Sequence, residues 1–138
     1  MADQTLYLTE LLGLKVFDLK HRLLGRVHDA VLVPVVHPVR VDRFLIAGGS
    51  GYSWLGVRHD QIASISLDGI TLNDEQLVPY HADEYMLRLV RDLLDQQIVD
   101  VDGRKVVRVN DLHFLKVGAC ELRLVHVDAG TRGLVRRM

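Results

Sequence analysis

Cysteine is nearly absent from this sequence of 138 residues, in which Cys120 is the only one. A single thiol cannot form an internal disulfide or a thiolate metal cluster, and this scarcity is typical of a protein in a reducing compartment. No apolar run approaches the roughly 20 residues of a membrane-spanning helix. The first ten residues, MADQTLYLTE, also lack the basic start and apolar middle of a signal peptide. We therefore predict a cytoplasmic location.

An excess of one charge is lacking as well. The 17 basic and 18 acidic side chains leave a formal net charge of −1, so no global field attracts nucleic acid or anionic lipid. We expect no nucleic-acid partner, and contact with a membrane only indirectly through a larger protein. A local basic patch is still compatible with this balance.

What the sequence does contain is an internal repeat. The stretch FDLKHRLLGRVHD at residues 17–29 returns in altered form as VDVDGRKVVRVND at residues 99–111, eighty-two positions later. An ungapped alignment of Leu11–Asp29 with Leu93–Asp111 gives seven identities in nineteen positions. This similarity indicates an internal duplication. We place the first repeat at residues 1–80 and the second at residues 81–138.

The second repeat has the clearer signal for a β-hairpin. Asp102-Gly103 suits a two-residue type I′ turn, because glycine adopts positive φ without a Cβ penalty. Such a turn would pair Val99 with Val106 and Ile98 with Val107. The first repeat has Lys20-His21 at this place, and we expect a looser or differently shaped turn there.

The same order of elements is predicted twice. Each repeat begins with a short strand and one helical turn, continues through the hairpin and ends in two further strands. In the first repeat, Thr9 is the expected helix N-cap. One helix over Asp83–Gln97 is an alternative in the second repeat, since Leu87, Val90 and Leu94 are spaced for one helix face. The predicted elements around the hairpins are Leu6–Leu8, Thr9–Gly13, Ala30–Val36, Arg40–Ala47, Tyr85–Val90, Arg91–Gln96, Leu112–Lys116 and Glu121–Val127.

The two repeats differ beyond these shared elements. The first continues through GGSGYSWLG at residues 48–56 into two expected strands, Val57–Ile65 and Gly69–Leu72. The second lacks a counterpart to these closing strands after Val127. We therefore expect either a fragment of a longer protein or a second repeat completed by a partner, because an unpaired strand edge promotes association. Both alternatives predict self-association, as a homodimer.

The repeated pattern resembles a known family. LLGLKVFDLKHRLLGRVHDAVL and LLDQQIVDVDGRKVVRVNDLHF are similar to PRC-barrel sequences, small six-stranded β-barrels of the photosynthetic reaction-centre H subunit and of a ribosome maturation factor. The resemblance covers nearly the whole chain as a tandem pair. It implies a mainly β fold of two small barrels with short helical turns, the second truncated or completed by a partner.

A closer resemblance concerns the second half. DLLDQQIVDVDGRKVVRVNDL together with LRLVHVDAGTRGLVRRM is similar to the cytoplasmic N-terminal region of bacterial proteins that join PRC-barrels to the N and CBS domains of MgtE-type magnesium transporters. This resemblance implies a regulatory or scaffolding module that contacts other domains of a magnesium or divalent-cation transport protein. It implies no chemistry of its own.

The residues themselves give little indication of an enzyme. The seven histidines are scattered without metal-ligand spacing, and no acid, base and nucleophile converge in the sequence. The equivalent Asp29 and Asp111 suggest local turn caps. GGSGYSWLG lacks the Lys-Ser/Thr and the following helix of a P-loop, which favours a hairpin connection. We predict no enzyme activity, no cofactor and no metal site.

Several residues are candidates for an interaction surface. Arg22 and Arg26 recur as Arg104 and Arg108, and residues four apart in a strand share a face, about 13 Å apart. They form either a solvated strand face or a surface for an acidic partner. Trp54 is either an exposed anchor or part of the core. The full candidate set is Arg22, Arg26, Arg104, Arg108, Trp54, Arg132, Arg136 and Arg137.

Three functions are compatible with these observations. The favoured one is a non-enzymatic interaction or regulatory module of an MgtE-like transport protein. The alternative, by analogy with the other PRC-barrel branch, is an RNA- or ribosome-associated assembly factor of the ribosome maturation factor type, which the neutral charge disfavours. An enzyme or small-ligand binder is the third. The first two depend largely on analogy of fold.

Overall fold

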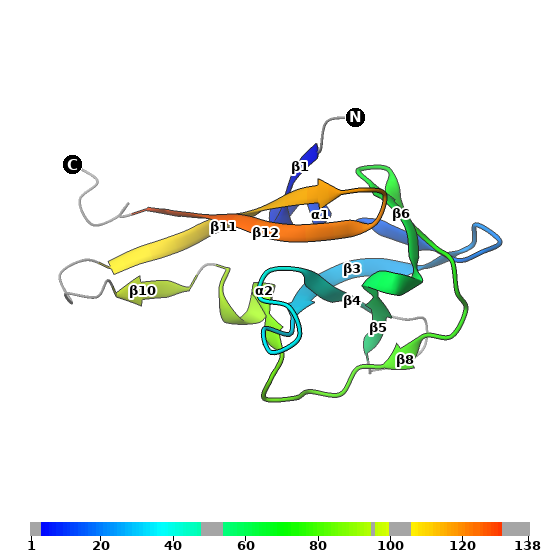
Figure 1. The fold of residues 1–138 in the computed structure, drawn as a ribbon, viewed down its shortest axis with the longest axis horizontal. Coiled ribbons are helices and arrows are strands. Elements are labelled where there is room, and N and C mark those ends of the chain that lie inside the picture. The colour runs from blue at the N-terminus through cyan, green and yellow to red at the C-terminus, as the bar shows by residue number, and fades with distance from the viewer. Residues whose placement is uncertain (1–3, 48–53, 95, 100–105, 131–138) are drawn as a thin grey trace.

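The computed structural model of the chain describes residues 4–47, 54–94, 96–99 and 106–130 (Figure 1). Strands predominate and the helices are single turns, which confirms the predicted mainly β class. The elements are β1 (Gln4–Tyr7), α1 (Leu8–Leu11), β2 (Lys15–Phe17), β3 (Leu23–Leu32), β4 (Val41–Ala47), β5 (Trp54–Arg58), η1 (His59–Gln61), β6 (Ile62–Ser66), β7 (Gly69–Leu72), β8 (Val78–Pro79), β9 (Leu87–Arg88), α2 (Leu89–Asp92), β10 (Gln97–Val99), β11 (Val106–Val117) and β12 (Glu121–Gly130).

The strands form two sheets. In the smaller sheet, β11 lies between β12 on one edge and both β1 and β10 on the other. The larger sheet has the order β6-β7-β2-β3-β4-β5-β8, and β9 also pairs with β3. Within the described residues neither sheet closes on itself, so the barrel closure stays a prediction. Figure 1 shows β11 and β12 as one layer lying across β3 and β4.

The first strand of each half belongs to the sheet of the other half. β1 pairs antiparallel with β11, where Leu6 lies opposite Phe114. β9 pairs antiparallel with β3, where Arg88 lies opposite Val31. Residues on both sides of the predicted boundary at position 80 therefore build each sheet. Buried side chains from both halves form one core cluster, which includes Leu6, Leu8, Val27, Phe44, Leu89, Leu112 and Phe114.

Backbone contacts recur eighty-two positions apart. The Val27 N–H donates to the Leu14 carbonyl at 2.9 Å, and the Val109 N–H donates to the Gln96 carbonyl at 3.1 Å. α1 and α2 are both single turns, as predicted, but they lie earlier than the predicted Thr9–Gly13 and Arg91–Gln96. They are followed by β2 and β10 at matching positions. The backbone thus follows similar paths in the two halves.

The predicted hairpin register is confirmed in the second half. Val99 pairs with Val106 and Ile98 with Val107; the turn between them, with Asp102-Gly103, lies outside the described residues. In the first half, β2 ends at Phe17 and β3 begins at Leu23, and His21 in the connection has φ of 59°. The looser turn expected at Lys20-His21 is therefore confirmed.

Several predicted boundaries were wrong. β3 and β11 are continuous where the sequence predicted a hairpin arm followed by a separate strand. The reason is that Val27/Asp29 and Val109/Asp111 flank β-bulges, which bend a strand without ending it. The strand predicted over Val57–Ile65 is interrupted by η1.

The helical predictions also need correction. The alternative helix over Asp83–Gln97 was wrong, because only Leu89–Asp92 is helical. Thr9 lies inside α1, and Tyr7 is the N-cap residue. No helix among the described residues has the length and apolar character needed to cross a membrane.

Candidate interaction site

Asp29 is a completely buried carboxylate on β3 that binds the start of α2. Its side chain accepts the Val90 N–H at 2.7 Å and the Arg91 N–H at 3.3 Å. It also accepts hydrogen bonds from Nε of Arg88 at 3.1 Å and from the backbone N–H of Ala30 at 2.8 Å. These N–H groups at the helix start have no partner within α2, so Asp29 supplies the acceptor that they need.

Asp111 performs the equivalent task for α1. One carboxylate oxygen accepts hydrogen bonds from the backbone N–H groups of Thr9 at 3.1 Å and Leu112 at 2.9 Å. The other oxygen accepts a hydrogen bond from the Thr9 hydroxyl at 2.6 Å. The local turn cap predicted for Asp29 and Asp111 was therefore wrong. Each carboxylate binds the helical turn of the opposite half, and together they connect the two halves.

Trp54 lies in a cluster beside this buried carboxylate. The Arg88 guanidinium carbon is 4.4 Å from the centroid of the Trp54 ring and 5.7 Å from that of Tyr80, a cation–π arrangement. The His28 ring is stacked at 5.7 Å from Trp54. Trp54 is half-buried in these contacts. Its position is therefore intermediate between the two alternatives predicted for it, an exposed anchor and a core residue.

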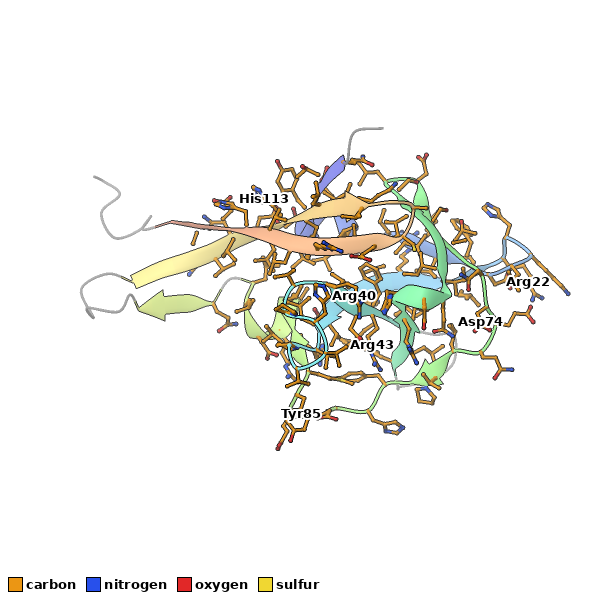
Figure 2. The ribbon with its side chains drawn as sticks, in the orientation of Figure 1. Arg22, Arg40, Arg43, Asp74, Tyr85 and His113 are labelled. Atoms are coloured by element: carbon orange, nitrogen blue, oxygen red, sulfur yellow. The ribbon has the colours of Figure 1, made fainter. Side chains whose placement is uncertain are left out.

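Arg22 and Arg26 do not share one strand face. Arg22 precedes β3 and binds Asp18 through Nε at 2.8 Å; Figure 2 shows it at the end of the molecule, far from His113. Arg26 is on β3, and its Nη1 donates to the Gly13 carbonyl at 3.1 Å. A bulge at Leu24 interrupts the alternation on which the predicted shared face rests. Arg108 is exposed on β11. The remaining candidates, Arg104, Arg132, Arg136 and Arg137, lie outside the described residues.

Asp18 organises the connection between β2 and β3. Its carboxylate accepts the backbone N–H groups of Lys20 and Arg22 at 2.8 Å each and Nε of Arg22 at 2.8 Å. The hydrogen bond from the Arg22 backbone is the main reason that the pKa of Asp18 lies below its ordinary value. The ionised carboxylate is thus the form that the folded loop favours.

We expect Asp18→Asn to change how stability depends on pH. Folding lowers the pKa of Asp18. The contribution of its carboxylate to the free energy of unfolding is therefore fully present above the pKa of the unfolded chain, about 3.9, and is lost as pH falls through the lower pKa of the folded chain. The difference in unfolding free energy between wild type and variant should therefore be constant near neutrality and shrink below about pH 4.

Urea titrations from pH 7 to pH 2 measure this difference. Asp68→Asn, at an exposed aspartate in the connection between β6 and β7, is the matched control. Wild-type and Asp18→Asn curves that stay parallel down to pH 2 would contradict the role assigned to Asp18.

A small aromatic cluster that was not predicted brings together residues that are scattered along the sequence. The Tyr7 and His113 rings meet edge to face at 4.2 Å between centroids, and the His113 and His126 rings are 5.0 Å apart. The register of β1, β11 and β12 places them side by side, with His113 opposite both Tyr7 and His126. Among the described residues, no three potential metal-ligating side chains form a group.

Within the described residues, the second half lacks partners for two strands whose counterparts in the first half are paired on both sides. In the first half, β2 pairs with both β3 and β7, and β4 pairs with both β3 and β5. Their counterparts β10 and β12 each pair as strands only with β11 in the part of the chain that the structure describes. The predicted lack of closing strands after Val127 falls largely on residues 131–138, which lie outside the described residues. We define residues 125–129 as the β12 edge; Val125 and Val127 there are 57% and 40% exposed.

Comparisons with known proteins do not assign a family. The chain matches no protein-family model and no curated protein. The PRC-barrel and MgtE resemblances therefore stay predictions based on the repeated motif. The candidate site is accordingly defined by geometry, as the β12 edge and the outer edge of β10, which lie on opposite sides of β11.

Proposed function

We propose that this chain is a non-enzymatic interaction and regulatory module, which serves as the cytosolic part of an MgtE-like transport protein for magnesium or another divalent cation. The observation that carries the proposal is the pair of unpaired edges on β10 and β12 in the described part of the chain. A strand that is unpaired on one side presents backbone N–H and C=O groups there, and another polypeptide can add a strand to them. The exposed valines of the β12 edge add apolar contact area.

The polar groups at the centre of the fold support a structural role. Asp29 and Asp111 are engaged by the N-termini of α2 and α1, and Asp18 is engaged by the loop before β3. These carboxylates hold strands and turns in position. A scaffold in which β10 and β12 each have one unpaired edge among the described residues fits a protein that recognises other protein segments.

A binding measurement with purified transporter domains tests the proposal. The complete chain is titrated by calorimetry into the N and CBS domains of an MgtE-type transporter from the same organism, with and without Mg²⁺. We expect a saturable complex with a dissociation constant below about 100 μM. No binding heat at that concentration under either condition would contradict the proposed function.

A further inference from the structure

We infer that the β12 edge pairs with the same edge of a second copy of this chain, antiparallel about a twofold axis through Val127. This inference rests on the proposed function and names one of the partners. The first half shows what kind of neighbour is missing: β4, the counterpart of β12, is covered by the antiparallel strand β5, from Arg43 opposite Arg58 to Ala47 opposite Trp54.

The free part of β12 has definite limits. At its start, the Leu124 N–H donates to the Val39 carbonyl at 2.8 Å, and Arg123 forms an isolated bridge with Arg40. Beyond Leu124, the five residues Val125 to Ala129 are all exposed. Val125 lies at a β-bulge, and His126 to Ala129 pair only with β11 among the described residues. The regular part of the available edge is therefore short, from His126 to Ala129.

The sequence of this edge is complementary to itself. In VHVDA, an antiparallel pairing centred on Val127 places His126 opposite Asp128 of the second copy, twice. Centring on Asp128 would bring two aspartates together, and centring on His126 would bring two histidines together. Two like charges directly opposite each other disfavour the register centred on Asp128. The register centred on His126 contains neither of the two His126–Asp128 pairs.

Within one chain, His126 and Asp128 do not face opposite charges. On β11, the residue opposite His126 is His113, and the residue opposite Asp128 is Asp111. Pairing with a second copy supplies each with the complementary group on its other side. Val127 and Ala129 lie on the opposite face of the strand from His126 and Asp128, and Val127 meets Val127 of the second copy. A twofold, self-complementary contact closes as a dimer.

Cysteine cross-linking tests this register. In a Cys120→Ser background, Val127→Cys places two thiols at directly opposite positions, about 5 Å apart between Cα atoms, which is within disulfide range. Val125→Cys is the matched control, because its two copies would lie about 14 Å apart. We expect mild oxidation to convert most of the Val127→Cys protein to covalent dimer and little of the Val125→Cys protein. Equal cross-linking of both, or of neither, would overturn the inference.

Charge exchange gives an independent measurement that does not depend on oxidation. His126→Asp places two acidic pairs in the dimer and should raise the dimer dissociation constant at least tenfold in sedimentation equilibrium. Adding Asp128→Lys to His126→Asp restores opposite charges and should recover most of this loss. Val35→Lys, at a valine 72% exposed in the loop between β3 and β4, should leave the dissociation constant unchanged. A double variant no better than His126→Asp would contradict the pairing.

The two proposals fail in different assays. A wild-type chain that stays monomeric at all concentrations overturns the inference, while its binding to the transporter domains still decides the proposed function. A dimer that does not bind those domains keeps the inference and overturns the transport role. Cross-linking at another position would assign the dimer to a different surface and reject the β12 edge.

Discussion

Asp29→Ala is expected to lower the free energy of unfolding by about 3 to 5 kcal/mol, because it removes one partner of a buried ion pair. Asp29 is fully buried and accepts hydrogen bonds from Arg88, Val90, Arg91 and Ala30. Without the carboxylate, the first N–H groups of α2 lose their acceptor. The Arg88 guanidinium would also remain in a largely buried position without its counter-charge.

Urea unfolding measures this loss, and Asp111→Ala provides the matched comparison in the other half. Asp111 is only half-buried and contacts Thr9 and Leu112 without an arginine, so we expect a loss of about 1 to 2 kcal/mol. The single tryptophan, Trp54, lies against Arg88, and its fluorescence reports whether the cluster is disturbed in the folded variant. Equal losses for Asp29→Ala and Asp111→Ala would contradict the central position assigned to Asp29.

Leu6→Ala is expected to destabilise the protein by about 3 to 4 kcal/mol, since it leaves a cavity in a closely packed core. Leu6 is completely buried on β1, opposite the completely buried Phe114 on β11. Leu6 belongs to the first half of the sequence, but its side chain packs in the sheet that the second half builds around β11. The exchange of β1 makes this small change affect both halves.

The same variant tests the coupling between the halves. Because β1 and β9 are exchanged, we expect one cooperative unfolding transition for wild type and for Leu6→Ala, followed by both far-ultraviolet circular dichroism and Trp54 fluorescence. Thr5→Ala, on the exposed face of the same strand, should change the unfolding free energy by less than about 0.5 kcal/mol. Two separate transitions would show that each half folds without the other.

Local features were predicted well from the sequence. The register of Val99 and Val106, the looser turn at Lys20-His21 and the single-turn helices all follow from dihedral preferences and short-range pairing. The strand Gly69–Leu72 was predicted with the bounds that β7 has. In each case the information lies within a few residues of the feature itself.

The role of the repeated aspartates was not predicted. The alignment showed that Asp29 and Asp111 occupy equivalent positions, but an aspartate near a strand end has the same local sequence whether it caps its own backbone or a distant helix. The contact partners are 61 and 102 positions away, at Val90 and Thr9. Similarly, the shared face expected for Arg22 and Arg26 failed because a bulge is invisible in a simple alternation of residues.

By itself, the sequence determined that this chain is mainly β and that it contains the same hairpin pattern twice. These properties depend on alternation, turn residues and repetition, which are local. Only the tertiary structure decided that β1 and β9 are exchanged, that each half caps the helical turn of the other and that the β12 edge stays exposed. Pairing between distant strands is selected by burial of the whole core, and no short stretch of sequence contains that information.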